Sequence, residues 1–358
     1  YTYDAAGNQT SMTDALSHTT QYKYDALNRQ VRIIYADGTQ STTEYDSLGR
    51  KVMSSDQAQV PTYYTYDLLG RLITVSLRAE GEAISTTYTY DELGNRLTQT
   101  DANTHTTSFE YDKLGRLTKK TLPMGQFETN DEYDPNGNII LKTDANGQKT
   151  RFAYDSNNRL LSKDYADNGT LDIEYTYHTT GEKKSMTDHH GITTYQYDSR
   201  GRLTHTTYPG GRNIDYEYDA NGNQTSSLEK DVDSTIIQSE VKTYDTLNRL
   251  KTITDTSGTT TYTYDKAGNR KSVTCPKGTI AEYTYNSLNR LTNLVNKKST
   301  GEIISSFTYT LGPTGNRLAV VTADGSKVDY TYDNLYRLTG EIRTGTNPYS
   351  ISYNYDNV

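Results

Sequence analysis

The feature that most constrains this chain is a dipeptide, Tyr-Asp, that returns every 20 to 26 residues along the whole sequence. There are 17 such tyrosine slots between Tyr3 and Tyr355, with a mean spacing of about 22 residues, and Asp completes the dipeptide in 14 of them. A fixed period is typical of repeat architectures, in which each unit packs mainly against its neighbours. We therefore predict a single array over residues 1–358, with about 16 repeats of about 22 residues. We also expect this array to be a fragment of a longer chain.

The positions around each slot tyrosine predict a strand, a turn and a returning strand. In 14 of 17 slots another aromatic residue stands two positions earlier, as Tyr22 and Phe109 do, which places both rings on one face of a strand. The Asp that follows can accept backbone N–H groups two residues on. Four residues after the tyrosine, 14 of 16 slots carry Gly or Asn, the residues that best tolerate positive φ. The signature residues that we assign to this structural role are Tyr24, Asp25, Tyr45, Asp46, Gly49, Tyr66, Asp67, Gly70, Tyr90, Asp91, Gly94, Tyr111, Asp112, Gly115, Tyr197, Asp198, Gly201, Tyr264, Asp265 and Gly268.

A second turn is predicted about midway between slots. Its tetrads are "ADGT" (36–39), "AEGE" (79–82), "DANG" (144–147), "PGGR" (209–212), "TSGT" (256–259) and "ADGS" (323–326). Two turns in each repeat leave two strands of six or seven residues, a normal strand length. We therefore expect an all-β fold: tandem hairpins joined into one antiparallel sheet of about 33 strands. The inserts of the longer repeats, residues 229–238 and 297–302, are expected in the loops of the second turns.

Four positions depart from the pattern, and their turns are expected to be built differently. His178, Asn286 and Thr310 replace the slot Asp, and Tyr336 stands where Gly or Asn is usual. From this we expect Val to be costly in place of Gly115 but mild in place of Tyr336.

Composition excludes several classes of protein. Hydrophobic residues make up 32% of the chain, yet 34 residues are Tyr, whose ring can build a thin apolar layer while its hydroxyl stays bonded or wet. A net charge of −8 without a basic stripe argues against nucleic acid as a partner. The single cysteine, Cys275, excludes a disulfide framework and a Cys-rich zinc site. No run of 18 apolar residues occurs, so we expect no membrane span.

The heptad Tyr-Asp-x-x-Gly-Arg-Leu, found at residues 66–72, 111–117 and 197–203, resembles the YD repeat of Rhs and related proteins. That family includes bacterial polymorphic toxin shells, the B and C components of insecticidal ABC toxin complexes, wall-associated proteins and teneurins. The resemblance covers the whole chain. It implies a ribbon of β-hairpins that spirals into a hollow, open shell segment. In the toxins such a shell encloses a C-terminal effector, and in teneurins it is an extracellular scaffold, so a secreted or cell-surface location is expected.

Strand geometry leads to the same shape. With neighbouring strands about 4.8 Å apart, about 33 strands make a strip about 160 Å long and about 23 Å wide. The fixed hand of strand twist makes such a strip curl regularly. We expect one loop that is open at both ends.

We interpret the candidate chemical groups as structural positions of the repeat and its turns, and we predict no catalytic, cofactor-binding or metal site. Asp134–Gly137 matches the Asp-Pro-x-Gly motif that Rhs-type shells use for self-cleavage, but it occupies an ordinary slot, so we interpret it and Asp144–Gly147 as turns. These tetrads lack the further ligands of a calcium loop. His18 and His105 share one register of the repeat, and Cys275 has no evident base partner.

Two classes of function remain, with an enzyme as a weaker third. The first is a structural scaffold, part of a shell that encapsulates a toxin or another effector. The second is an adhesion or carbohydrate-binding module of a wall-associated or teneurin-like protein, in which tyrosine rings hold a sugar or a cell-surface partner. The expected partners are the remaining repeats and caps of the parent protein and an enclosed effector domain.

Overall fold

The computed structural model describes residues 1–79 and 82–356. Within these residues the chain forms 33 β-strands and one short 3-10 turn, η1 (Pro209–Gly211), and no α-helix. The prediction of an all-β hairpin array is confirmed. The centre of the second turn expected at residues 79–82 lies outside the described residues. No helix in the described part of the chain is long and apolar enough to cross a membrane.

The strands alternate with short turns along the whole chain. The first eleven are β1 (Thr2–Tyr3), β2 (Gln9–Thr13), β3 (Thr19–Tyr24), β4 (Gln30–Ile34), β5 (Gln40–Tyr45), β6 (Lys51–Ser55), β7 (Pro61–Tyr66), β8 (Leu72–Ala79), β9 (Glu82–Tyr90), β10 (Arg96–Thr100) and β11 (Thr106–Tyr111). The next eleven are β12 (Leu117–Thr121), β13 (Phe127–Tyr133), β14 (Ile139–Thr143), β15 (Lys149–Tyr154), β16 (Leu160–Asp164), β17 (Ile173–Tyr177), β18 (Lys183–Asp188), β19 (Gly191–Tyr197), β20 (Leu203–Thr207), β21 (Asn213–Tyr218) and β22 (Gln224–Lys230). The last are β23 (Ile236–Tyr244), β24 (Leu250–Asp255), β25 (Gly258–Tyr264), β26 (Arg270–Thr274), β27 (Ile280–Tyr285), β28 (Leu291–Lys297), β29 (Ile303–Leu311), β30 (Arg317–Thr322), β31 (Lys327–Tyr332), β32 (Leu338–Thr344) and β33 (Tyr349–Ser352).

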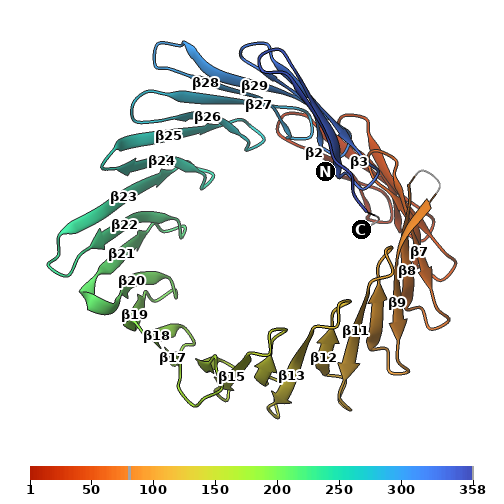
Figure 1. The fold of residues 1–358 in the computed structure, drawn as a ribbon. Helices are drawn as coiled ribbons and strands as arrows, with labels where there is room; N and C mark the ends of the chain where they lie inside the picture. Colours follow the sequence, from red (N-terminus) through yellow and green to blue (C-terminus); the bar gives the residue numbers. More distant parts are fainter. Residues whose placement is uncertain (80–81, 357–358) are drawn as a thin grey trace. The chain divides into compact units, whose positions relative to one another are not determined.

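Each strand pairs antiparallel with the next strand in the chain, and the strands belong to one sheet. Tyr22 of β3 faces Ile33 of β4, for example, and Ile33 in turn faces Ser41 of β5. Figure 1 shows the strands following one another in chain order as the colour changes from red through green to blue. The fold is therefore a ribbon of hairpins without crossovers between neighbours.

The chain divides into two compact units. The first comprises Tyr1–Thr89, Gln99–His105 and Thr261–Val358, and the second comprises Tyr90–Thr98 and Thr106–Thr260. The first unit contains hairpins from both ends of the sequence, and these meet: Nη2 of Arg290 lies 2.6 Å from Oε1 of Gln57. The second unit is a run of successive hairpins from β11 to β24.

The core is a thin layer. Among the described residues the buried apolar side chains are few, namely Phe109, Leu141, Ala319, Val320 and Val328. Most other strand side chains in the described part of the chain are half-buried, and their nearest neighbours lie on adjacent strands of the same sheet. A tyrosine-rich composition suits this arrangement, since the ring packs laterally while the hydroxyl bonds at the edge.

The inserts lie in the strands, which corrects the expectation that they enlarge loops. Around the first insert the turn from Asp231 to Thr235 keeps the ordinary size, while β22 has 7 residues and β23 has 9. Around the second, Lys298–Glu302 is again an ordinary turn between the 7-residue β28 and the 9-residue β29. Growth of both paired strands preserves hydrogen bonding and keeps the turn that fixes the register.

The slot expected at Tyr309 lies two residues further on. Gly312 donates its N–H to the carbonyl of Asn316 at 2.8 Å, and Gly315 donates to the carbonyl of Gly312 at 2.9 Å. Leu311 thus holds the place of the slot tyrosine, and Tyr309 that of the aromatic residue two positions earlier. Because many repeats carry tyrosine at both places, the sequence does not distinguish them where the Asp is missing.

Candidate functional site

The slot turn is a five-residue loop with one left-handed residue. In the loop between β3 and β4, Asp25 N donates to Arg29 O and Asn28 N donates to Asp25 O, both at 3.0 Å, and φ of Asn28 is 60°. Oδ1 of Asp25 accepts the N–H groups of Leu27 at 2.9 Å and Arg29 at 3.0 Å. The strand register shifts between Lys23 and the slot tyrosine. This is a type I turn followed by a left-handed residue and a β-bulge, a common hairpin connection.

The turns expected to differ keep the same backbone. Tyr336 has φ of 61° and donates its N–H to Asp333 O at 3.0 Å, as Gly or Asn does elsewhere. Asn286 replaces Asp with an amide oxygen that accepts two backbone N–H groups at 3.0 Å. His178 N still bonds Glu182 O at 2.8 Å. The expectation was wrong because backbone bonds close the loop, and the slot carboxylate adds to them.

The second turn of the repeat is in many cases the same loop. In Asp14–His18, Ser17 has φ of 69°, and Nδ1 of His18 lies 3.0 Å from Oδ2 of Asp14. Asp101–His105 repeats this arrangement, with Thr104 at φ of 67°. His18 and His105 therefore occupy the place that Arg29 has in a slot turn. The spacing Asp-x-x-Ser/Thr-His was visible in the sequence and would have revealed the equivalence.

The signature residues join each repeat to the next. Nε of Arg29 donates to Oδ2 of Asp25 at 2.7 Å within its own turn. The same guanidinium lies 4.6 Å from the centroid of the Tyr45 ring, and its Nη1 donates to Asp46 O at 3.3 Å. The Tyr45 hydroxyl donates back to Gln30 O at 3.2 Å. One arginine thus binds its own turn and, by cation–π and hydrogen-bond contacts, the following repeat.

We call this contact the Arg–Tyr pair: the arginine five residues after one slot tyrosine and the tyrosine of the next slot. It recurs at Arg50–Tyr66, Arg116–Tyr133, Arg159–Tyr177, Arg202–Tyr218 and Arg337–Tyr355, with cation-to-centroid distances of 4.8, 4.4, 4.6, 4.7 and 4.8 Å. The slot hydroxyl bonds a carbonyl of the preceding repeat in the same way from Tyr24, Tyr66, Tyr111, Tyr177, Tyr218 and Tyr285. The contact is thus a property of the repeat.

Asparagine replaces arginine as the last residue of some slot turns. In four of them it contacts an Asn at the left-handed position of the next slot turn. Nδ2 of Asn138 donates to Oδ2 of Asp134 and to Oδ1 of Asn158, both at 2.8 Å. The same amide contact joins Asn8 to Asn28, Asn223 to Asn248 and Asn269 to Asn289. All four slot turns with a left-handed Asn follow a turn that ends in Asn, whereas every slot turn that follows an Arg has Gly at that place.

Contact distances explain this pairing. A Cβ added at Gly49 would lie 3.7 Å from Nη1 of Arg29, and one added at Gly315 would lie 3.4 Å from Nε of Arg290. The guanidinium thus lies within van der Waals contact of any Cβ at the left-handed position, so a side chain longer than Cβ would compete with it for space. The rule holds in one direction only, since Gly115, whose added Cβ would lie 3.4 Å from Oδ1 of Asn95, follows a turn that ends in Asn. Our sequence interpretation grouped Gly and Asn together and missed this rule.

The slot carboxylates of Asp25 and Asp134 are stabilised as anions. The side-chain bond from Arg29 is the main cause that lowers the pKa of Asp25; its backbone N–H adds to this, and partial desolvation opposes it. In Asp134 the side-chain bond from Asn138 is the main cause of a lowered pKa. Asp134–Gly137 is an ordinary slot turn, with Gly137 at φ of 91°. A general acid or base needs a pKa near the working pH, and these groups are shifted away from it.

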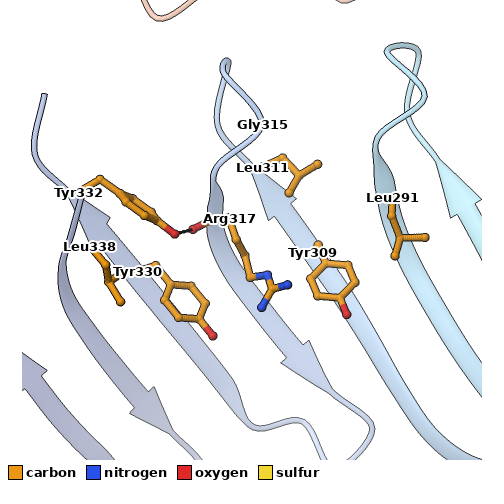
Figure 2. Close-up of a pocket in the computed structure, with 8 residues that line it drawn as sticks. All are labelled: Leu291, Tyr309, Leu311, Gly315, Arg317, Tyr330, Tyr332 and Leu338. Carbon is orange, nitrogen blue, oxygen red and sulfur yellow. Dashed lines mark hydrogen bonds between the residues drawn. The ribbon is translucent and has the colours of Figure 1, made fainter. Parts of the chain in front are cut away.

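The tyrosines form an open face, which Figure 2 shows for the last repeats. The guanidinium of Arg317 lies between two rings, 4.7 Å from the centroid of Tyr309 and 6.0 Å from that of Tyr330. The Tyr332 hydroxyl donates to Arg317 O at 2.8 Å. Leu338 lines the same shallow groove. Arg317 thus contacts the rings of Tyr309 and Tyr330 through its guanidinium and the hydroxyl of Tyr332 through its carbonyl.

One charged cluster on β20 to β22 was not foreseen. Nδ1 of His205 lies 2.6 Å from Oδ1 of Asp215, Nε2 lies 3.0 Å from the Thr207 hydroxyl, and Nζ of Lys230 lies 2.8 Å from the other Asp215 oxygen. The order Asp-His-Thr resembles a hydrolytic triad. However, Lys230 is the main cause that lowers the pKa of Asp215, and the His205 and Asp215 side chains lie on the open sheet, 26% and 38% exposed. We assign the cluster to holding three strands in register.

The remaining candidates stay apart. His189 and His190 form the two-residue loop between Asp188 and Gly191, with their ring centroids 3.7 Å apart. Cys275 is exposed at the first position of a second turn. Within residues 1–79 and 82–356, no three His, Cys, Asp or Glu side chains gather as metal ligands would.

Comparison with known proteins gives two matching families. The RHS Repeat family matches residues 3–40 and 244–280, and the Teneurin YD-shell family matches residues 50–181 and 101–239, which together span more than half of the chain. No curated protein matches the chain in sequence.

Among solved structures, the chain is similar to TcdB2-TccC3, with a TM-score of 0.78, 17% identity and coverage of 95% of this chain. It is also similar to the Tc holotoxin pore of Photorhabdus luminescens with a mutated TccC3, with a TM-score of 0.76, 17% identity and 91% coverage. The chain spans 21% and 19% of those two chains. At this level of identity the likeness shows the fold.

Proposed function

Because the chain belongs to the Teneurin YD-shell family, we propose that it is a structural scaffold, a stretch of hairpin ribbon in the wall of a shell that encloses an effector segment of its parent protein. The observation that carries this proposal is the use of the signature residues. Arg29, Tyr45 and their equivalents join one repeat to the next. Contacts that join each repeat to the next build a continuous ribbon, which is what the wall of a shell requires.

The partners in this proposal are the remaining repeats of the parent protein, its caps and the enclosed effector, and the location is extracellular. The Tc neighbours support it because one is TcdB2-TccC3 and another is a Tc holotoxin pore that contains TccC3. The proposed role is not enzymatic. The slot carboxylates of Asp25 and Asp134 have lowered pKa values and are bonded within turns, so they suit structure better than proton transfer.

The alternative, a carbohydrate-binding adhesion module, has less support. A sugar platform needs an accessible aromatic face, yet the rings of Tyr45 and Tyr66 lie against Arg29 and Arg50. Their hydroxyls donate to backbone carbonyls of the preceding repeat. A sugar would have to displace the contacts that hold neighbouring repeats together.

Protease protection in the full parent protein tests containment. We expect the segment downstream of the repeats to resist a protease in the native protein and to become cleavable when Arg50→Ala and Arg202→Ala loosen the wall. Equal cleavage in the native protein and the double variant, at the rate of the isolated segment, would contradict containment. Lys113→Ala, at an exposed turn tip, is the matched control.

A further inference from the structure

One slot turn of the second unit carries its charged residues in reverse. The loop between β17 and β18 has His178 in the place of the slot Asp, and Glu182 in the place of the arginine or asparagine that ends every other complete slot turn. The backbone is unchanged, since Gly181 donates its N–H to the carbonyl of His178 at 3.0 Å and has φ of 109°. The two residues therefore change the charge that this turn presents to the next repeat and leave its fold intact.

The carboxylate of Glu182 lies where a guanidinium lies in other repeats. A Cβ added at Gly201, the left-handed residue of the next slot turn, would lie 3.1 Å from Oε1 of Glu182. One added at Gly49 would lie 3.7 Å from Nη1 of Arg29, in the same relation to its neighbouring turn. Burial is the main cause that raises the pKa of Tyr197, and the charge of Glu182 adds to it, which places the carboxylate near the phenol. An anion thus stands beside a slot tyrosine where other repeats supply a cation.

Tyr197 lacks both contacts of the slot tyrosine before it. On the preceding hairpin the Arg159 guanidinium lies 4.6 Å from the centroid of the Tyr177 ring, and the Tyr177 hydroxyl donates to Leu160 O at 2.7 Å. Within residues 1–79 and 82–356, no arginine or lysine lies over the Tyr197 ring, and its hydroxyl has no hydrogen-bond partner. The centroids of the His178 and Tyr197 rings are 6.1 Å apart, with the ring planes nearly perpendicular. Tyr197 is therefore free to accept a cation and a hydrogen bond.

His178, Glu182 and Tyr197 line one cavity between the two hairpins. Its volume is about 310 Å³, at the lower end of the range of small-molecule sites. A second carboxylate in its lining, that of Asp198, is held by Nε of Arg202 at 2.7 Å. Glu182, in contrast, has no arginine or lysine partner in the described part of the chain. The cavity thus contains one half-buried carboxylate whose charge no arginine or lysine balances.

We propose that this cavity binds a guanidinium group from outside the ribbon, with Glu182 as its ion-pair partner and the Tyr197 ring as the surface on which it stacks. A planar guanidinium can bond a carboxylate through two N–H groups and lie on an aromatic ring at the same time. The imidazole of His178, when neutral, can accept a further hydrogen bond from the same group. The Arg–Tyr pairs show that slot tyrosines of this fold receive that cation. The site is formed by two consecutive hairpins, and the inference does not depend on the proposed shell.

Isothermal titration calorimetry with argininamide tests the site, because this probe carries a guanidinium and no carboxylate. We expect saturable binding to the native chain and binding about tenfold weaker to Glu182→Gln, which keeps the shape of the side chain and removes its charge. Glu174→Gln is the matched control, since Glu174 is exposed on β17 of the same hairpin, on the face opposite Tyr175, and should not affect the affinity. A native chain that does not bind, or a Glu182→Gln variant that binds as tightly as the native chain, would overturn the proposal.

A variant that restores the ordinary repeat separates lost binding from misfolding. In His178→Asp/Glu182→Arg the new arginine should stack on Tyr197 from within the chain, next to Gly201, the residue type that follows every arginine-ended slot turn. We expect this variant to unfold at a temperature at least as high as the native chain and to lose argininamide binding. Binding that persists in the variant, with its circular dichroism unchanged, would show that the probe binds elsewhere and would overturn the proposal.

Two further probes define the ligand. Lysinamide has the same charge as argininamide without the planar guanidinium, so we expect it to bind more weakly, and an equal affinity would overturn the assignment to a guanidinium. A Gly-Arg-Gly peptide with blocked ends carries the group as a side chain. Tighter binding of this peptide than of argininamide would support an arginine of a polypeptide as the source, and tighter binding of argininamide would support a free small molecule.

Discussion

The guanidinium of Arg29 lies 4.6 Å from the centroid of the Tyr45 ring, and this contact joins the turn of one repeat to the strand of the next. It explains why tyrosine, aspartate and arginine recur together. Asp25 holds Arg29 in place, and Arg29 in turn packs on Tyr45. In an array of this kind stability is close to a sum of repeat terms and neighbour terms, and the Arg–Tyr pair is a neighbour term.

Removal of one Arg–Tyr pair should loosen the array locally. Arg50→Ala loses the 2.7 Å bond to Asp46 and the stacking on Tyr66, 4.8 Å away. We expect a loss of about 1–3 kcal/mol in the free energy of unfolding, measured in urea. Hydrogen exchange should rise mainly in β5 to β8. Lys113→Ala should change little, and a uniform rise in exchange along the chain would contradict local coupling.

The pairing of neighbouring turns should appear as an energetic coupling. Asn158→Gly removes the amide bond from Asn138, and Asn138→Arg crowds the side chain of Asn158. The double variant recreates the Arg-then-Gly combination found at Arg29 and Gly49. We expect each single variant to be less stable than the native chain and the double variant to recover part of the loss. The coupling energy should be about 0.5–3 kcal/mol in a double-mutant cycle, and additive losses would refute the pairing rule.

Valine at either left-handed turn position should be costly. Gly115 has φ of 75° and Tyr336 has φ of 61°, a region that a β-branched residue enters at a cost of about 1–3 kcal/mol. Tyr336→Val also loses the contact with Asp56, so it should destabilise at least as much as Gly115→Val in thermal unfolding. A mild effect at Tyr336 would restore the expectation drawn from the sequence alone.

The slot carboxylates should make the array sensitive to acid. The pKa of Asp25 in the folded chain lies below its usual value, mainly because of the side-chain bond from Arg29. A group with a lowered folded pKa contributes stability that is present above its unfolded pKa and is lost as the pH falls through the folded value. The free energy of unfolding should therefore decrease in the acid range, and less steeply in Asp25→Asn. Identical slopes for the two proteins would count against this assignment.

The contact between the Tyr336 hydroxyl and Asp56 should weaken in alkali. Burial, with Asp56 as the next cause, raises the pKa of Tyr336 to about 12. A raised folded pKa contributes stability that is present below the ordinary tyrosine pKa of about 10 and is lost as the pH rises through about 12. In Tyr336→Phe the increase in phenolate absorbance near pH 12 should be smaller than in the native chain. Tyr1→Phe, at a ring that is 77% exposed, should leave that increase in place and is the control.

Local signals in the sequence were sufficient for the hairpins and for the left-handed turns, because each is decided within about five residues. Asp25 and Asn28, for example, lie in the same loop, and together they predict it. The contact between Tyr336 and Asp56 could not be predicted, since the two residues are 280 positions apart and nothing near either residue indicates the other. The slot near Tyr309 was misplaced because tyrosine suits two positions of the strand equally well. The pairing of Asn138 with Asn158 could have been found in the sequence, but only by comparing the residues of neighbouring turns.

The bonds between repeats also affect the order in which the chain folds during its synthesis on the ribosome. The hydroxyl of Tyr45 reaches back 15 residues to Gln30, and Arg29 reaches forward 17 residues to Asp46, so a hairpin has its partners soon after it emerges. Contacts this close in sequence cost little chain entropy, and they let folding keep pace with synthesis. The contact between Asp56 and Tyr336 differs, because Tyr336 is synthesised 280 residues after Asp56. The early second turns, including Gln57, therefore stay uncovered until Tyr336 and Arg290 have been made, and a nascent chain is open to a wrong partner at that edge until then.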